Sequence, residues 1–344
     1  MKRIGIDCRF AATSTGLGRY SRELVTHLLQ RNDAVQYVLF VQSKHEEWLR
    51  PLAAHAVVRE VKSGHYSAAE QWELPRLIRK AQLDLYVALH FNVPFFCPVP
   101  FVVTIHDLIL HRYPNQASAV KQMAYKILMY RAVRRARHII AVSEFTKQEL
   151  AYFYGKYAAQ RTTVIYEGVA DMFHRPAASV MEAVRQKYSL FKPFFLYVGN
   201  AKQHKNVPML LEAFKKAETR GRELILVTGG KEAASLHLPP GARFLSSISD
   251  VDLPALYALA DACVTASLYE GFGLPVVEAE AVGCPVIASA RASIPEVASD
   301  TALLVEPTTE AFIAALSKKS FSAPAPRPWK WDETAAKTAE IVGA

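Results

Sequence analysis

The sequence predicts an α/β protein made of two domains with parallel sheets, and three observations support this class. Short runs rich in β-branched and aromatic residues alternate with longer amphipathic segments, as in βαβ units. This alternation occurs twice, once in each half of the chain. The length of 344 residues fits two domains, and a hydrophobic content of 51% can fill two cores.

In the first half the pattern predicts seven strands, with helices between several of them. The strands are expected at residues 3–7, 37–41, 57–61, 83–89, 101–106, 138–143 and 163–166, and two helices at 20–30 and 119–137. Residues 1–171 are therefore expected to form a Rossmann-like domain.

In the second half the strands are expected at residues 194–198, 224–228, 243–245, 262–266, 285–288 and 302–305, with helices such as 207–216 and 253–260 between them. Residues 172–324 should form a second Rossmann-like domain, and residues 325–344 a C-terminal helical segment that follows a proline-rich connector at 321–329. Because ligands bind at the carboxyl ends of parallel strands, we expect the two domains to face each other across a binding cleft.

Local signals mark several helix ends. Gly283 should stop one helix, and Asp332 should be the N-cap of the last one. Asp250 and Asp252 resemble a metal-binding pair, but they directly precede a helix and should cap it. No other cluster has the spacing of metal ligands, so no metal is expected.

The formal net charge of +9 lies entirely in the first half. Residues 1–171 contain 23 lysines and arginines against 14 acidic residues, and residues 172–344 contain 18 of each. This asymmetry favours an anionic partner such as a phosphate or an anionic membrane surface. The basic segment 126–138 fits peripheral contact with anionic lipid as well as it fits a solvated helix face. No nucleic-acid-binding module is recognisable, so a nucleic acid is not expected.

Compartment signals point to the cytoplasm. The four cysteines form no CxxC pair, and a reducing compartment fits them best. The N-terminus lacks a signal-peptide pattern, and no run of eighteen apolar residues occurs. We therefore expect a cytoplasmic protein, located at the inner face of the membrane if it contacts lipid.

A glycine turn, TSTGLGRYSREL at residues 13–24, follows the first strand and opens a helix. Gly16 and Gly18 would let an anion approach the backbone at the helix N-terminus. An ordinary flexible turn can have the same composition. The third glycine of a dinucleotide fingerprint is missing, which argues against NAD.

His106 ends the apolar strand of VVTIHDLIL, residues 102–110. A histidine at a strand end can donate a hydrogen bond or exchange a proton near neutral pH. The alternative is a core histidine bonded to a neighbouring carbonyl.

The segment YVGNAKQHKNVPMLLEAF, residues 197–214, repeats the strand, glycine turn and helix in the second half. Lys205 stands at the helix entrance, where it can neutralise a diphosphate together with backbone amides. Lys202, farther out, fits a solvated basic loop equally well.

The segment SLYEGFGLPVVEAEAVGCPVIAS, residues 267–289, places two acids around a glycine-rich turn. Glu270 precedes the turn and Glu278 lies within the following helix. The amides of residues 271–274 can form an anion-binding nest, and a carboxylate accepts neighbouring sugar or ribose hydroxyls. Helix-end electrostatics would explain Glu278 or Glu280, but not the whole pattern.

This segment resembles the E-x7-E region of retaining glycosyltransferases with the GT-B fold, family four. GLGRYSREL, TIHDL and GNAKQHKN agree with that family in order and spacing. The late helix at 331–338 agrees too, and in that family it crosses back onto the N-terminal domain. The first-strand GID followed by GLGRY is most similar to bacterial mannosyltransferases that use GDP-mannose.

The resemblance implies a role for each matching residue. Glu278 would bind the ribose of a nucleotide sugar, Glu270 the donor sugar, and Lys205 the diphosphate as the bond breaks. His106 would sit at the donor sugar and assist transfer. Backbone groups would contact sugar or phosphate oxygens at Gly16, Gly18, Gly271, Phe272, Gly273 and Leu274.

No cofactor beyond the nucleotide-sugar donor, expected to be GDP-mannose, follows from the resemblance. The donor would bind the C-terminal domain, and a glycan or lipid-linked acceptor the N-terminal domain, with His90 and Asn92 as acceptor-side candidates. Two departures matter. Asn200 stands where many relatives have arginine, so Lys205 must supply more of the phosphate charge. The segment LSSISD, residues 245–250, lacks a glycine that often precedes the base contact.

Two other functions remain open at this point. A nucleotide-sugar epimerase could use the same fold, and it would convert the donor without an acceptor. A scaffold that binds nucleotide sugars without turnover is also open, although Glu270, Glu278, Lys205 and His106 argue against it.

Overall fold

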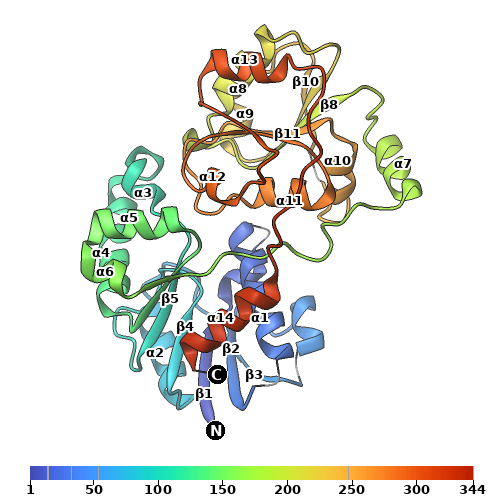
Figure 1. The fold of residues 1–344 in the computed structure, drawn as a ribbon. Helices are drawn as coiled ribbons and strands as arrows, with labels where there is room; N and C mark the ends of the chain where they lie inside the picture. Colours follow the sequence, from blue (N-terminus) through green and yellow to red (C-terminus); the bar gives the residue numbers. More distant parts are fainter. Residues whose placement is uncertain (14, 32, 53, 247, 344) are drawn as a thin grey trace. The chain divides into compact units, whose positions relative to one another are not determined.

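A computed structural model describes residues 1–13, 15–31, 33–52, 54–246 and 248–343. The chain divides into two compact units (Figure 1). Unit 1 comprises Met1–Gly168 and Trp329–Ala344, and unit 2 comprises Val169–Pro328. The breaks lie a few residues from positions 171 and 324, where the sequence places them.

Unit 1 contains, within its described residues, a sheet of seven parallel strands in the order β3-β2-β1-β4-β5-β6-β7. The strands are β1 (Lys2–Asp7), β2 (Val35–Val41), β3 (Ala56–Glu60), β4 (Leu85–Ala88), β5 (Phe101–Ile105), β6 (His138–Ala141) and β7 (Thr162–Val164). The order reverses between β1 and β4, where Ile6 pairs with Val87. This switch point is where ligands bind in doubly wound sheets.

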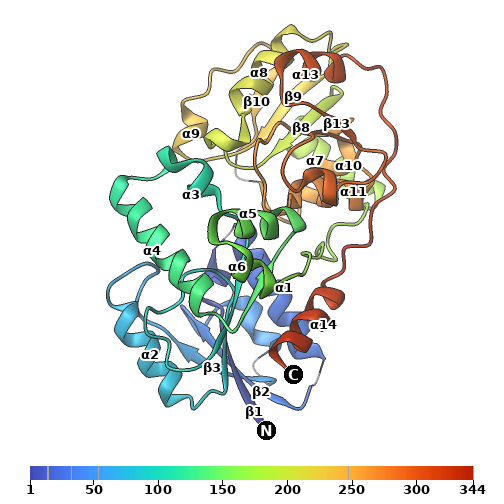
Figure 2. The same cartoon turned by 60° about the vertical axis from the view of Figure 1, so that its left-hand side comes forward.

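Helices cover both faces of this sheet (Figures 1 and 2). They are η1 (Arg9–Ala12), α1 (Gly16–Gln30), η2 (Glu47–Leu52), α2 (Glu70–Lys80), α3 (Ile109–Arg112), η3 (Pro114–Gln116), α4 (Ala119–Arg135), α5 (Glu144–Tyr154), α6 (Lys156–Gln160) and α14 (Trp331–Val342). Alternation along β5 separates the layers: Val103 and Ile105 join a core with α2 and α4, whereas Thr104 meets Tyr20 of α1.

The C-terminal helix α14 packs on α1, so the end of the chain belongs to unit 1. The Lys2 ammonium donates to the Val342 carbonyl at 2.6 Å, which places both ends of the chain side by side (Figure 1). The expectation that Asp332 caps this helix is wrong. The helix begins at Trp331, and Asp332 lies in its first turn, where it bonds with His27 at 2.7 Å.

Unit 2 contains, among the residues described, a sheet of six parallel strands in the order β10-β9-β8-β11-β12-β13. The strands are β8 (Phe194–Val198), β9 (Glu223–Val227), β10 (Ala242–Phe244), β11 (Ala262–Thr265), β12 (Val286–Ser289) and β13 (Leu303–Val305). The helices are α7 (Ala178–Lys187), η4 (Gln203–Lys205), α8 (Val207–Lys216), α9 (Lys231–Ala234), α10 (Leu253–Leu259), α11 (Leu274–Val282), α12 (Ile294–Val297) and α13 (Thr309–Leu316).

Alternate residues of these strands feed two cores, one on each face of the sheet. Leu196 joins a core with α10 and α11, and its neighbours Phe195 and Tyr197 join another with α8 and α13. The predicted stop of α11 is confirmed, because Gly283 caps that helix at a φ of +91°. No helix in the described ranges is long and apolar enough to cross a membrane.

Candidate functional site

The switch point of unit 2 brings together the two loops that the sequence singles out. One loop follows β8 and carries Lys205, and the other follows β11 and carries Glu270. The Leu268 amide donates to the His204 carbonyl at 2.7 Å, which ties the loops together. The Lys205 ammonium lies 2.5 Å from a Glu270 carboxylate oxygen, and both side chains are 13% exposed.

Burial distinguishes Lys205 from Lys202 and Asn200 of the same loop. Lys202 and Asn200 are exposed, and the Asn200 side chain accepts the Lys202 amide at 3.2 Å. The pKa of the buried His204 falls to about 4, mainly through burial and then through the charge of Lys205. His204 is therefore neutral at pH 7, and Lys205 is the partly buried cation of this loop.

Ser293 stabilises the glycine-rich turn after Glu270 through hydrogen bonds to its backbone. The Ser293 hydroxyl, fully buried, lies 3.1 Å from the Glu270 carbonyl and 2.8 Å from that of Phe272. Gly273 is the N-cap of α11, and its φ of +107° favours glycine. Leu274 is the first helical residue, so residues 271–274 form the turn that enters the helix. No local sequence signal marks Ser293 as a support of this turn, because 23 positions separate it from Glu270.

The two later acids of this segment lie within α11 and are buried. Helix-end electrostatics explains neither of them, because the first turn of α11 contains no acid. Glu280 accepts the Ser299 amide and, at 2.7 Å, the Ser299 hydroxyl, and burial raises its pKa. Glu278 accepts the Tyr257 hydroxyl at 3.4 Å. Glu280 thus anchors the loop after α12, a structural role.

Asp252 does not act as a side-chain cap. It occupies the N-cap position of α10, but its carboxylate accepts Lys187 at 2.6 Å and Tyr188 at 2.7 Å. Among the described residues no group of three or more His, Cys, Asp or Glu side chains could hold a metal ion. In the neighbouring segment 245–250, expected near the base, Ser247 lies outside the described residues.

The glycine turn of unit 1 opens α1, and its two glycines differ. Gly16 is exposed at the first helical position. Gly18 is buried and its amide donates to Thr15 at 3.4 Å. A Cβ at position 18 would lie 2.0 Å from the Thr13 carbonyl oxygen, so packing alone requires this glycine.

His106 lies at the carboxyl end of β5, where protein groups engage both ring nitrogens. Its Nε2 lies 2.9 Å from the Leu89 carbonyl, and its Nδ1 lies 3.2 Å from a Glu167 carboxylate oxygen. Burial by itself lowers the pKa of His106, but the hydrogen bond and charge of Glu167 outweigh burial and raise it. The sequence carries no signal for this partnership, because 61 residues separate the pair.

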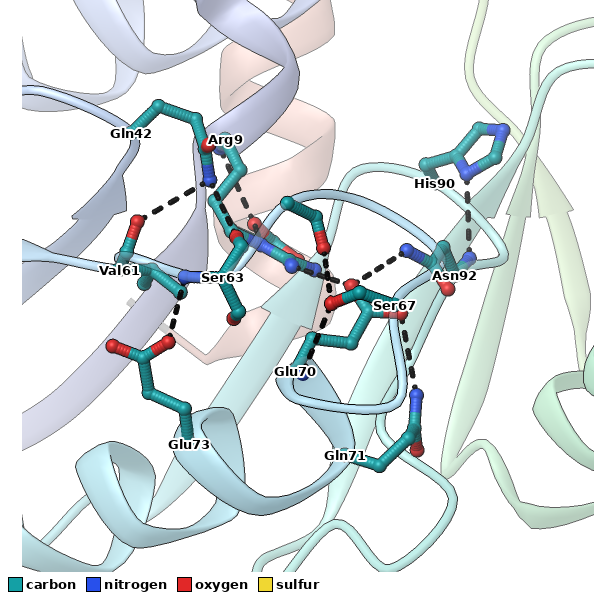
Figure 3. Close-up of polar contacts among 12 residues, drawn as sticks. Arg9, Gln42, Val61, Ser63, Ser67, Glu70, Gln71, Glu73, His90 and Asn92 are labelled. Atoms are coloured by element: carbon teal, nitrogen blue, oxygen red, sulfur yellow. Dashed lines mark hydrogen bonds and ion pairs between the residues drawn. The ribbon is translucent and has the colours of Figure 1, made fainter.

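The candidates His90 and Asn92 belong to a buried network at the switch point of unit 1 (Figure 3). Arg9, fully buried, bonds Asp7 at 2.8 Å and Glu70 at 2.7 Å. The Asn92 side chain donates to the same Glu70 oxygen at 3.2 Å, and the Asn92 backbone N–H donates to His90 Nδ1 at 3.3 Å. The network therefore gives Asn92 a structural role.

His90 stands at the rim of this network. Burial lowers its pKa well below the ordinary value, and the nearby His106 lowers it further. Its ring packs on Phe10 at 4.7 Å and on Phe91 at 4.1 Å. His90 is thus a neutral ring within an aromatic cluster, half-buried at the end of β4.

Family comparisons agree with both units. Residues 181–338 match the model described as Glycosyl transferases group 1, and residues 14–171 match Glycosyltransferase Family 4. The chain belongs to the group 1 glycosyltransferases. This glycosyltransferase is 29% identical over 290 residues to O-antigen chain mannosyltransferase B of Escherichia coli, covering 77% of the chain and 76% of that protein. It is 27% identical to O-antigen chain mannosyltransferase RfbU of Salmonella typhimurium, covering 79% and 78%.

Solved structures show that this glycosyltransferase has the GT-B fold. Sucrose-phosphate synthase from Thermosynechococcus elongatus superposes with a TM-score of 0.78 at 20% identity, covering 100% of this chain and 98% of that one. Anabaena HepE in complex with UDP and glucose superposes with a TM-score of 0.76 at 18% identity, covering all of both chains. The predicted fold class and the predicted family are both confirmed.

Proposed function

We propose that this glycosyltransferase moves mannose from GDP-mannose to a glycan or a lipid-linked acceptor, with retention of configuration at the sugar. The contact of Lys205 with Glu270 carries the proposal. It sets a cation beside a hydroxyl acceptor where two strand-ends of unit 2 meet. The names of two relatives, both O-antigen mannosyltransferases, favour mannose.

In this proposal the bound donor replaces the contact between Lys205 and Glu270 by its own contacts with each of them. The Lys205 ammonium binds the diphosphate and stabilises the negative charge that grows as the glycosidic bond breaks. The Glu270 carboxylate accepts sugar hydroxyls, and Glu278 accepts those of the ribose. Lys205 supplies a positive charge from the chain itself, and on this basis we propose transfer without a metal.

Backbone groups complete the proposed donor site. Anionic oxygens are favoured at the start of α11 because its amides and dipole point there. The residues proposed to contact sugar or phosphate there are Gly271, Phe272, Gly273 and Leu274, with Asn200 beside Lys205. In unit 1 we propose the same role for the turn at Gly16 and Gly18, with Gly16 at the exposed first position of its helix.

We further propose that unit 1 contacts an anionic membrane at a cytoplasmic face through the outer side of α4. Exposed apolar side chains follow one side of this helix at spacings of three and four: Val120, Met123, Ile127 and Tyr130. Its sequence has five basic residues and no acidic one. A hollow of about 390 Å³ beside it is lined by Ile127, Tyr130, Lys126 and Arg131, with His111 and Tyr154.

An apolar stripe flanked by cations fits the boundary between lipid headgroups and acyl chains. The opposite side of α4 is occupied, because Tyr125 and Met129 pack in the core of unit 1. Figures 1 and 2 both draw α4 at the margin of that unit. A lipid-linked acceptor would be delivered at such a surface.

The donor assignment is tested by a thermal-shift panel of GDP, UDP and ADP, each with and without a sugar. A nucleotide at 100 times its Kd stabilises the native state by about 2.7 kcal/mol, so the preferred base should raise the melting temperature most. We expect GDP-mannose to do so. A larger shift with UDP-sugars would overturn the base, and no shift with any nucleotide would overturn the donor site.

Turnover separates transfer from its two alternatives. An epimerase would convert the sugar when it is given the donor alone. A scaffold would release no nucleotide, even when both donor and acceptor are present. A mannosyltransferase should release GDP in step with acceptor glycosylation. Proton NMR of the product should then show the anomeric configuration of the donor, and inversion would contradict the proposed retention.

A further inference from the structure

The contact of Glu167 with His106 connects the candidate catalytic histidine to the C-terminal helix. Glu167, 5% exposed, lies in the segment by which the chain leaves unit 1. This segment is fixed on both sides. The Ile165 amide donates to the Ala141 carbonyl at 2.9 Å, and the Tyr166 carbonyl accepts the Thr334 hydroxyl of α14 at 2.8 Å.

Gly168, the residue after Glu167, shows how closely α14 packs against this segment. A Cβ at Gly168 would lie 2.4 Å from the Trp331 amide nitrogen and 2.5 Å from its ring, so a larger residue does not fit. The Trp331 ring packs edge-on against Tyr20 at 5.5 Å, and Tyr20 packs edge-on against His106 at 4.5 Å. The first turn of α14 therefore braces both members of the pair.

Hydrogen bonding determines which form of the His106 ring this arrangement selects. A carbonyl only accepts, so Nε2 must carry a proton to bond with Leu89. An ionised carboxylate also only accepts, so Nδ1 bonds with Glu167 as a second donor. The geometry thus selects the doubly protonated imidazolium, which donates hydrogen bonds and cannot act as a base.

We propose that Glu167 is a positioning residue that keeps His106 protonated and fixed in orientation. Within the transfer proposed above, His106 then acts as a fixed positive charge, because both of its N–H groups are already bonded to Leu89 and Glu167. Other charged or titratable groups face the ring as well. Asp107 favours its charged form, and His90 is close enough to sense that charge. Glu167 differs from them because its carboxylate contacts the ring directly.

Histidine NMR on the free protein tests the charge state without reference to activity. The ring signals of His106, assigned by their loss in His106→Asn, should titrate above the ordinary histidine pKa of about 6.5. Glu167→Gln keeps the shape and removes the charge, so it should lower the protonation constant roughly tenfold or more. Glu340→Gln replaces an exposed carboxylate of α14 in the same way, and it should leave the protonation constant of His106 unchanged. A wild-type ring that titrates at or below 6.5 would overturn the proposal, even if the variant failed to fold.

Kinetics then test whether the effect acts through the histidine. With a protonated His106 required, activity should fall as pH rises through its pKa, and in Glu167→Gln this fall should move to lower pH. The variant should lower kcat and leave the donor KM unchanged, and Glu167→Asp should restore part of the loss. In a His106→Asn background Glu167→Gln should add nothing, because the two residues act as one unit. An unshifted pH profile, or additive losses, would reduce Glu167 to a structural residue.

Discussion

The Lys205 ammonium of unit 2 is bonded to the Glu270 carboxylate at 2.5 Å, although 65 residues separate them. Their contact follows from strand order, because β8 and β11 are neighbours at the point where the strand order reverses. Each side chain fixes the position of the other. In the proposed function a nucleotide sugar would give each of them a new partner, a diphosphate for the cation and hydroxyls for the carboxylate.

Lys205→Ala should lower kcat by roughly 10²–10³-fold, as removal of one group that stabilises transition-state charge does. The loss should appear in kcat measured at saturating donor, and nucleotide release is a direct assay. Lys202→Ala provides the matched control, because Lys202 is an exposed lysine of the same loop. Equal losses in the two variants would show that overall loop charge matters, and not the cation paired with Glu270.

Two neighbouring acids of α11 should separate binding from stability. Glu278→Gln should weaken nucleotide binding by about 1.5–3 kcal/mol, the value of a hydrogen bond to a charged group, with little change in melting temperature. Glu280→Gln should lower the melting temperature and leave nucleotide affinity unchanged, because Glu280 anchors Ser299. Calorimetric titration and thermal unfolding measure the two effects, and reversed outcomes would exchange the two roles.

Gly18→Ala should destabilise unit 1 by about 1–3 kcal/mol, the usual cost of overpacking. The added methyl group would overlap the Thr13 carbonyl at 2.0 Å. Gly64→Ala is the control, because a Cβ there meets no atom within 4 Å. Urea unfolding measures both variants. A Gly18→Ala protein of unchanged stability would mean that the turn relaxes and that packing does not require the glycine.

Introducing negative charges into the apolar stripe of α4 should abolish binding to anionic vesicles. Met123→Glu with Ile127→Glu removes two exposed apolar contacts and adds two negative charges. Cosedimentation with phosphatidylglycerol–phosphatidylcholine vesicles measures the loss, and pure phosphatidylcholine vesicles test the electrostatic part. Val180→Glu, an exposed apolar residue of unit 2, is the control. Wild-type protein that stays in the supernatant would overturn the membrane proposal.

His111 should make stability pH-dependent in the mildly acidic range. Burial, and then the charge of Lys126, lower its pKa to about 4, so folding favours the neutral ring. The stabilisation is full above the unfolded pKa of about 6.5 and is lost as pH falls towards 4, since the unfolded state binds the proton more readily. His111→Gln should flatten the decline of melting temperature between these values. His55→Gln, an exposed exchange in the same unit, should leave it unchanged.

The fold and the positions of the candidate donor-site motifs could be predicted from the sequence because their signals are local. Strand and helix periodicities alternate in each half, Gly283 ends α11, and the acids of the E-x7-E segment stand at fixed spacing. Periodicity reports only which face of an element is buried. The local pattern placed Lys205 at a helix entrance and Glu270 before a turn, and it predicted two parallel sheets correctly.

The tertiary structure decided which of these residues act on one another. Side-chain partners come from distant segments. Ser293 donates to the carbonyl of Glu270, and Ser299 donates to the carboxylate of Glu280. Glu167 contacts the ring of His106. All three pairings depend on strand order, and the segment that carries Glu167 is also held by the last helix. Local sequence determines an element and its buried face, whereas a hydrogen bond requires two atoms within about 3 Å. Only the completed packing brings atoms that close, so the sequence determined the candidates and the fold determined their partners.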